Sequence, residues 1–404
     1  MKLLFLTDNY HPETNAPATR TFQHAKFWAE QGHKITIITS CPNFPEGKVH
    51  TGFKNFWFKK TIEQGIEVIR VKTFISSNQG TVLRIFDFLS FMFSSFFFGM
   101  FTKRFDVIVG TSPQFFTVVS AWALSKLKRI PFIFELRDIW PESIISVGAL
   151  KKSFAISIIS KFSLFLYKEA QIIIAVTNSF KEYLLKLGIP ESKIKVIFNG
   201  ADDYQKSNRK DDGQLDKLGL EGKFVVSYIG THGLAHGLDK VIEAAELLQS
   251  HQDIIFLLIG SGANKKKLNE TIRLKKIKNV ISLDNQPKEN LPQYWEKSKI
   301  ALVSLINQDL FKTVIPSKIF EAASYNVPIL AAIPKGEATK IIESYKSGVI
   351  VQPENPYKLA QKIIELKQNP KSLNFMSKNC TIICEKFSRK KMATKMIQTI
   401  ERLI

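Results

Sequence analysis

The sequence contains little cysteine. Its three thiols, Cys41, Cys380 and Cys384, cannot form a disulfide framework, which indicates a reducing compartment. Cys380 and Cys384 stand four residues apart, a spacing that suits either a metal or redox pair or two buried thiols on one helix face. Because no further cysteine or histidine stands at ligand spacing, we favour buried thiols and expect neither a metal nor another cofactor.

Acidic residues are also scarce. The chain has 36 Asp and Glu against 57 Lys and Arg, and its formal net charge is +21. The excess is spread over both halves of the chain, which suits an anionic membrane surface or phosphate-bearing ligands. Nucleic acid is the rival partner. Zinc-ligand spacing, an RNP-like aromatic strand and a recognisable basic helix are all missing, so we expect no nucleic acid.

No apolar run reaches the length of a membrane span. The stretch FLSFMFSSFFFGMFT holds 15 uncharged residues between Asp87 and Lys103, whereas roughly 20 are needed to cross a bilayer. Within Val82–Phe101 the sequence therefore predicts either a buried helix or a helix in the membrane interface. At the N-terminus, Asp8 comes too early for the apolar core of a signal peptide, so KLLFLTD is predicted to be a strand.

What the chain does contain is an alternation of short β-branched runs with amphipathic helical patterns, which is typical of βαβ units. The alternation breaks at the polar segment NGADDYQKSNRKDDGQLDKLGLEGK and then resumes. We therefore predict an α/β protein with two Rossmann-like, doubly wound parallel-sheet domains, residues 1–200 and 201–384. Residues 385–404 are predicted to be a helix that returns to the first domain. Because such sheets bind ligands at the carboxyl ends of their strands, the domains should face a cleft lined by βα loops.

One loop of the second domain is rich in glycine. In YIGTHGLAHGLDK, glycines at 230, 233 and 237 separate a strand from a helix, so backbone N–H groups and the helix dipole favour an anion. The spacing matches neither a dinucleotide fingerprint nor a P-loop. The alternatives are a tight turn without a ligand and a metal site on His232 and His236, but no carboxylate motif completes such a metal site.

A second loop leads into the helix of IPSKIFEAASYN, which Ser317 is expected to cap. Lys318 then lies in the first turn, where the helix dipole disfavours a cation unless an anion also binds. A phosphate would supply that anion, and Glu321, one turn further on, would accept hydrogen bonds from a ribose diol. The alternative is a solvated lysine and glutamate on a surface helix.

Three loops of the first domain are candidates for a second ligand. They are DNYHPETNAPATR after the first strand, GTSPQFF, and FELRDIWPES, where a structural salt bridge is the alternative to a site. Their candidate residues are Asn15, Ala16, Thr111, Ser112, Arg137, Asp138 and Glu142.

Four segments in this order resemble the family 4 glycosyltransferases of the GT-B fold, and the resemblance covers essentially the whole chain. They are FWAEQGHKITIITS, FNGADDY, SYIGTHGLAHGLDKVIEAAELL and IPSKIFEAASYNVPILAA. The RDIWPES loop and the PSK-x-FE element resemble a bacterial O-antigen and surface-polysaccharide subgroup, and within it an L-fucosamine (FucNAc) transferase. The resemblance implies transfer of an amino sugar, L-FucNAc, from a UDP-sugar to a lipid-linked GlcNAc-pyrophosphate acceptor without a metal.

The resemblance also implies roles and a location. The UDP-sugar donor would contact Asn199, Gly230, Thr231, His232, His236, Ser317, Lys318 and Glu321. The polyprenyl-pyrophosphate acceptor would lie near Asn15, Ala16, Thr111 and Ser112, with Asp138 or Glu142 as the base and Arg137 on the acceptor phosphate. The enzyme would be cytoplasmic and peripheral, on the anionic inner face of the plasma membrane.

Several positions depart from the family pattern. The first glutamate of the family's E-x7-E pair is replaced by Thr313, and the N-terminal Gly-Gly loop by Asn15-Ala16. The family's Arg and Lys for the diphosphate fall on Thr231 or His232 and on His236, so Lys318 is predicted to take over that charge. Two rival functions follow: a GT-B sugar-nucleotide 2-epimerase, and a non-catalytic protein that binds sugar nucleotides.

Overall fold

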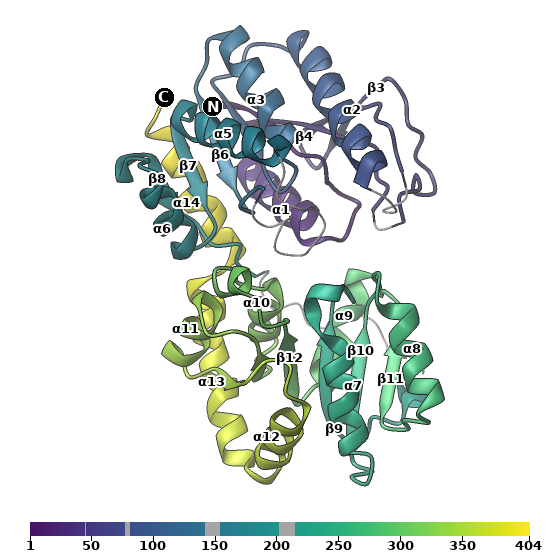
Figure 1. Ribbon diagram of the computed structural model, residues 1–404. Coiled ribbons are helices and arrows are strands. Elements are labelled where there is room, and N and C mark those ends of the chain that lie inside the picture. The colour runs from purple at the N-terminus through teal and green to yellow at the C-terminus, as the bar shows by residue number, and fades with distance from the viewer. Residues whose placement is uncertain (45, 77–80, 142–153, 202–214) are drawn as a thin grey trace. The chain divides into compact units, whose positions relative to one another are not determined.

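The computed structural model describes residues 1–44, 46–76, 81–141, 154–201 and 215–404. They form two compact units: unit 1 holds residues 1–199 and 389–404, and unit 2 holds residues 200–388. Each unit is built around one sheet with helices on its faces (Figure 1). This is the predicted α/β class. Most of the predicted linker, residues 202–214, lies outside the described residues.

Unit 1 has an eight-stranded sheet in the order β3-β4-β2-β1-β5-β6-β7-β8. Neighbouring strands run parallel except β3, which pairs antiparallel with β4. The strands are β1 (Lys2–Leu6), β2 (Lys34–Thr39), β3 (Phe58–Glu63), β4 (Ile66–Val71), β5 (Val107–Thr111), β6 (Phe132–Leu136), β7 (Ile172–Ala175) and β8 (Ile194–Val196). The sequence did not predict β3, because FKKTIE is polar and lies exposed at the sheet edge.

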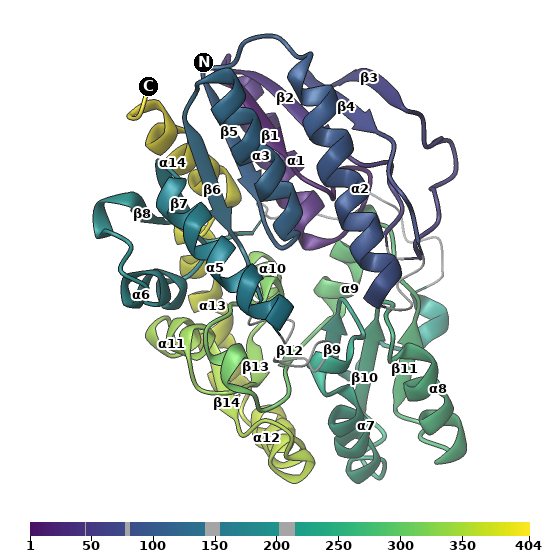
Figure 2. The same ribbon diagram turned by 45° about the horizontal axis from the view of Figure 1, so that its top comes forward.

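Helices cover both faces of this sheet. On one face, α2 (Thr81–Met100) and α3 (Phe115–Lys128) pack side by side, and α1 (Ala16–Glu30) and α14 (Arg389–Glu401) cover the other (Figure 2). The remaining helices of unit 1 are α5 (Phe154–Glu169) and α6 (Asn178–Lys186). Trp28 is fully buried, and its Nε1 donates to Ala393 O at 2.8 Å, which joins α1 to α14. The final helix thus packs on unit 1, although α13 still continues to Lys386, beyond the predicted start at residue 385.

Unit 2 has a six-stranded, all-parallel sheet in the order β11-β10-β9-β12-β13-β14. Its strands are β9 (Phe224–Ile229), β10 (Ile254–Ile259), β11 (Val280–Leu283), β12 (Ile300–Ser304), β13 (Ile329–Ala332) and β14 (Gly348–Val351). Its helices are α7 (Leu238–Leu247), α8 (Lys265–Leu274), α9 (Leu291–Lys297), α10 (Ser317–Ser324), α11 (Glu337–Ser344), α12 (Pro356–Gln368) and α13 (Pro370–Lys386). Because β9 and β12 are central neighbours, the loops that follow them meet at one edge of the sheet.

The apolar helix α2 is packed on one side only. Ser95 Oγ donates to Ser120 Oγ of α3 at 2.8 Å, and Gly99 lies against the Leu124 side chain. Within the described chain, α2 is the one helix long and apolar enough to cross a membrane by length and composition, but only 17% of its Leu83–Met100 window is buried. The buried-helix alternative is therefore wrong, since Phe93 and Phe97 face outward.

Candidate active site

The glycine-rich loop after β9 is held against the loop after β10. His232 N donates to Ser261 O at 2.8 Å, and Asn264 N donates to His232 O at 2.9 Å. Gly260 and Gly262 permit this approach, because a Cβ on Gly260 would overlap Gly230 O and one on Gly262 would lie 2.7 Å from His232 O. At Gly237, φ is +55°, a left-handed conformation that glycine adopts without strain, and α7 begins directly after it. The loop is therefore rigid and ends at a helix N-terminus.

The two histidines of this loop carry no charge at neutral pH. His232 is fully buried, and burial together with nearby Lys265 and Lys318 lowers its pKa to about 4. Burial and then Lys318 lower the pKa of His236 to about 3. Within the described residues, no group of three His, Cys, Asp or Glu side chains is arranged to hold a metal ion. The positive charge of this region must therefore come from lysine.

Lys318 supplies that charge. Its Nζ lies 4.8 Å from the centre of the Tyr228 ring, and a Cβ added to Gly230 would stand 3.0 Å from the same Nζ. Among the residues that the structure describes, Lys318 forms neither a hydrogen bond nor a salt bridge. Burial lowers its pKa from 10.5 to about 8, and Glu321 opposes that shift. The ammonium group is thus charged at pH 7 and lies against the glycine-rich loop without a direct counter-ion.

The start of α10 differs from the prediction. Pro316 occupies the N-cap position and Ser317 is the first helical residue, so Ser317 does not cap the helix. Pro316 gives the helix no side-chain cap, and the N–H of Ile319 donates to Pro316 O at 3.1 Å. Glu321 is half-buried one turn further along. At Thr313, where the family has a glutamate, Oγ1 donates to Leu310 O at 2.7 Å and stays within its own turn. Without a side-chain cap, the N–H groups of Ser317 and Lys318 at the start of α10 suit an anion.

Sequence reasoning missed Tyr228. Its ring lies beneath Lys318, and its hydroxyl donates to Thr231 O at 2.6 Å, so it supports both the cation and the loop. Its position two residues before the first glycine of the loop was the feature of the sequence that could have identified it.

The predicted donor residue Asn199 belongs to unit 1, whereas the other predicted donor residues belong to unit 2.

In unit 1, Ser112 organises the loop after β6. Its Oγ accepts from Arg137 N at 2.7 Å and from Asp138 N at 3.1 Å, and its side chain is buried. Thr111 is also buried, and its Oγ1 donates to Ser112 O. The structure thus brings the two loops together, with the hydroxyls of Thr111 and Ser112 engaged inside the protein. Arg137 and Asp138 are half-buried at the end of β6.

A second arginine lies behind this loop. Arg20 of α1 is fully buried and forms an ion pair with Glu135 of β6. Arg137 Nη1 donates to Pro17 O at 3.4 Å, and burial with nearby Arg389 lowers the pKa of Arg137 to about 9. Sequence reasoning did not single out Arg20, because it lies on the inner face of a helix far from β6 in the chain. An arginine-rich environment of this kind favours a bound anion.

The first loop of unit 1 has its own structure. Asn15 is the N-cap of α1, since its Oδ1 accepts from Ala18 N at 2.9 Å, while its Nδ2 donates to Asn9 Oδ1 at 2.7 Å. Ala16 is exposed. Glu142 lies outside the described residues.

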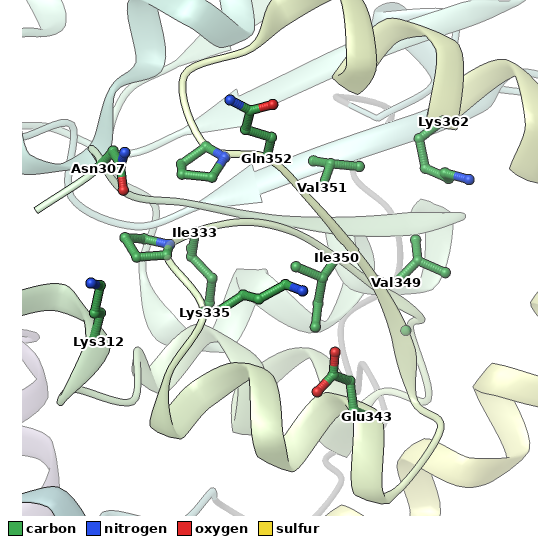
Figure 3. A pocket seen from close by; sticks show the side chains of 13 residues that line it. Asn307, Lys312, Ile333, Lys335, Glu343, Val349, Ile350, Val351, Gln352 and Lys362 are labelled. Atoms are coloured by element: carbon green, nitrogen blue, oxygen red, sulfur yellow. The ribbon is translucent and has the colours of Figure 1, made fainter. Parts of the chain in front are cut away.

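A cavity of about 720 Å³ lies on unit 2 at the β13–β14 edge (Figure 3). Its charged lining comes from Lys312, Lys335, Lys362 and Glu343. None of the predicted donor residues lines it, and Lys312 and Lys362 are paired with Asp309 and Glu365. The site around Lys318 is therefore distinct from this cavity.

Comparisons with known proteins agree with this architecture. Residues 18–205 match the family described as Glycosyltransferase Family 4, and residues 211–381 match Glycosyl transferases group 1. The chain is 24% identical to a protein of Escherichia coli K12 named as the colanic acid biosynthesis glycosyl transferase WcaI, over 88% of this chain and 89% of that one. It is also 24% identical to the glycosyltransferase WbjE of Pseudomonas aeruginosa, over 65% and 66% of the two chains.

Solved structures share the fold. Anabaena HepE in complex with UDP and glucose superposes with a TM-score of 0.73 at 18% identity, over 100% of both chains. The sucrose-phosphate synthase of Thermosynechococcus elongatus superposes with a TM-score of 0.76 at 14% identity, over 100% of this chain and 99% of that one. The first family model matches mainly unit 1, and the second matches residues of unit 2. The chain is therefore a glycosyltransferase of the GT-B fold, and its first half is similar to the Glycosyltransferase Family 4 model.

Proposed function

We propose that this glycosyltransferase moves an amino sugar, L-FucNAc, from a UDP-sugar to a lipid-linked GlcNAc-pyrophosphate acceptor in the synthesis of a surface polysaccharide. The observation that carries the donor half is Lys318, a half-buried cation without a direct ion-pair partner among the described residues, set against a glycine-rich loop. The names of the relatives, colanic acid synthesis among them, support a polysaccharide product. The sugar itself rests on the RDIWPES and PSK-x-FE resemblance.

On the donor side, the proposed chemistry is stabilisation of the leaving group. When the bond from the sugar to UDP breaks, negative charge grows on the diphosphate. Lys318, the start of α10 and backbone N–H groups of the glycine-rich loop would share that charge, which needs no metal. Glu321 then accepts from the ribose hydroxyls. The complexes of HepE with UDP and with UDP-glucose support a uridine nucleotide as the donor carrier.

On the acceptor side, we assign the pyrophosphate to Arg137. It stands at the carboxyl end of β6, and the Ser112 hydroxyl fixes its backbone. A guanidinium binds phosphate oxygens in a bidentate manner and remains charged at neutral pH, even with the lowered pKa. Asp138 and the first loop around Asn15 and Ala16 are assigned to the sugar of the acceptor.

An aromatic surface on unit 1 supports a peripheral location on the inner face of the plasma membrane. This surface is formed by exposed Phe56, Trp57, Phe58, Ile62, Phe93, Phe97 and Phe101. Its β3 and α2 parts are in contact, because the Phe58 and Phe98 rings lie 5.4 Å apart and Phe97 contacts both Phe98 and Phe101. Lys72 lies 4.4 Å from the Trp57 ring centre, so cations border the surface. Since α2 packs along α3, it would lie in the interface instead of crossing the bilayer.

A transfer assay tests the function. Polyprenyl-pyrophosphate-GlcNAc is offered with a panel of UDP-amino sugars to the wild type, Glu321→Gln and the control Glu30→Gln, whose side chain is exposed on α1. We expect transfer from UDP-L-FucNAc by the wild type and the control, with strongly reduced transfer by Glu321→Gln. Isomerisation of the UDP-sugar without acceptor would instead assign a 2-epimerase. UDP binding without turnover of any donor would assign a non-catalytic binding protein.

Membrane association has its own test. The triple variant Phe93→Ser/Phe97→Ser/Phe101→Ser should lose flotation with anionic liposomes, because three exposed rings of the aromatic surface are removed. The matched control is Leu247→Ser/Leu274→Ser/Phe375→Ser, which removes exposed apolar side chains of unit 2. Equal flotation of both triple variants and the wild type would contradict the assignment.

A further inference from the structure

The sheet of unit 2 has an open edge at β14. This strand is the last in the sheet order, and within the described chain its one paired neighbour is β13. Ile329 N donates to Ser347 O at 3.1 Å, and the parallel ladder that starts there turns the N–H and C=O groups of Val349 toward β13. The N–H and C=O groups of Gly348 and Ile350 therefore point away from β13. No other described residue pairs with them, so they can bind a ligand.

The cavity beside β14 follows this edge (Figure 3). Its lining includes residues 348–353, which are the whole of β14 and the next two residues. Helices form its sides, since Glu343 comes from α11 and Lys362 from α12. These helices lie on opposite faces of the sheet, because α12 packs with α7, and right-handed crossovers in opposite directions place α7 and α11 on different faces. A strand edge between two helices forms a groove that fits an extended chain of about six residues.

Positive charge runs along this groove. Lys335 extends across its middle, and Lys312 and Lys362 lie toward its two ends (Figure 3). With Glu343 as the one carboxylate of the lining, the three ammonium groups give the lining a net charge of +2. Lys335 is exposed and has no ion-pair or hydrogen-bond partner among the described residues. The carboxylates that pair with the other two lysines stand outside the lining, and such solvent-exposed pairs are weak, so the groove favours an acidic chain.

We propose that the groove along β14 is a docking site for an extended acidic segment of a partner protein, which joins the sheet as an added strand. The backbone of the segment exchanges hydrogen bonds with Gly348 and Ile350, and its carboxylates lie against Lys335 and the lysines at the two ends of the groove. This inference does not rest on the proposed function, since none of the predicted donor residues lines the groove.

Lysines at a sheet edge have a second possible role, which is to keep two copies of the edge from pairing with one another. In that role they repel another copy of the same edge, and an acidic segment gains no specific affinity. Binding of acidic peptides by the full chain therefore separates the two roles.

The first test is fluorescence anisotropy with three labelled peptides of about six residues. One peptide alternates glutamate with valine, the second has lysine in place of glutamate, and the third is the glutamate peptide with methyl groups on its backbone nitrogens. We expect saturable binding of the first peptide. The other two should bind about tenfold more weakly or less, because one has the wrong charge and the other cannot donate backbone hydrogen bonds.

The second test uses variants of the chain with the glutamate peptide. Ile350→Pro removes an outward N–H and keeps the ladder to β13, since proline is tolerated at an edge whose N–H faces solvent. It should weaken binding about fivefold or more, with Tm close to that of the wild type, whereas Ile350→Val should bind normally. Lys335→Glu should weaken binding by about 2- to 30-fold, because it replaces the attraction of an exposed pair with repulsion.

The matched control is Ser282→Pro, which removes an outward N–H from β11, the opposite edge of the same sheet. This variant should bind the glutamate peptide as the wild type does. The inference is overturned if the wild type shows no saturable binding of that peptide, or if the methylated peptide binds equally well. It is also overturned if Ser282→Pro weakens binding as much as Ile350→Pro. Sugar transfer is measured separately, so the proposed function stands or falls on its own assay.

A variant that fails to fold does not block the test. If Ile350→Pro lowers Tm strongly, Lys335→Glu decides the result, because this exposed side chain can be replaced without loss of core packing. Unchanged affinity of Lys335→Glu for both the glutamate and the lysine peptide would then overturn the inference.

Discussion

Lys318→Met is the perturbation that most sharply separates a ligand-binding lysine from a structural one. The change removes the ammonium group and keeps most of the apolar stem. In the free protein, burial lowers the pKa of Lys318 from 10.5 to about 8, so the charged form is disfavoured by about 3 kcal/mol at 1.36 kcal/mol per pH unit. This free energy is an upper limit, because Lys318 is half-buried and not fully enclosed.

The charge of Lys318 has opposite effects on the stability of the free protein and on the binding of UDP. A lysine with a lowered pKa destabilises the fold while it is charged, and this cost fades as the pH rises from about 8 to about 10.5. At pH 7, Lys318→Met should therefore raise the Tm of the free protein. The same variant should lose a charge-assisted hydrogen bond to the diphosphate of UDP, which is worth about 1.5–3 kcal/mol. UDP affinity should fall by about 10- to 150-fold.

Isothermal titration with UDP and thermal melts measure the two effects on the same samples. Lys267→Met is the matched control, since it removes one exposed lysine of unit 2 and changes net charge equally. Lys318→Arg adds a pH test. The affinity of the wild type for UDP should weaken above about pH 8, because Lys318 loses its proton there. The affinity of the arginine variant for UDP should persist to higher pH, because arginine stays charged. The reasoning is refuted if Lys318→Met lowers the Tm of the free protein and binds UDP as tightly as Lys267→Met.

Two further predictions concern the scaffold. Gly260→Ala should destabilise unit 2 by more than about 2 kcal/mol in urea unfolding and weaken UDP binding, because the new Cβ would overlap Gly230 O. Gly188→Ala has a positive φ without a neighbour within 4 Å, so it should show only the smaller backbone strain; equal losses in both would contradict the packing argument. Trp28→Phe should destabilise unit 1 by about 1–3 kcal/mol, since Ala393 O loses a buried donor. If Trp28→Phe leaves the midpoint of urea unfolding unchanged, the hydrogen bond between α1 and α14 does not stabilise unit 1.

Periodicity predicted most of the fold because the strands of parallel sheets are buried on both faces and read as apolar runs. All six strands of unit 2 lie within such runs. The exception is β3, a polar edge strand whose FKKTIE sequence carries no core pattern. That omission also hid half of the aromatic surface, since Phe58 and Ile62 lie on β3 and meet α2 only in three dimensions.

The candidate site was predictable where the signal was local. The glycine-rich loop and the Lys318–Glu321 spacing stand within short segments. The residues that surround the site could not be predicted, because their contacts join distant parts of the chain. Tyr228 of β9 lies against Lys318 of α10, and Arg20 pairs with Glu135, 115 positions away in the sequence. Ser317 was taken for a cap on residue type, although the extended residue before the helix is Pro316.

The most direct test of the central claim is to follow UDP release and sugar product together by mass spectrometry, with and without polyprenyl-pyrophosphate-GlcNAc. The wild type should release UDP in step with a glycosylated lipid when the acceptor is present, and Lys318→Met should do so far more slowly. Without acceptor, the UDP-sugar should stay intact. Conversion of the UDP-sugar at the same rate in the absence of acceptor would contradict the assignment of this chain as a lipid-linked-acceptor glycosyltransferase.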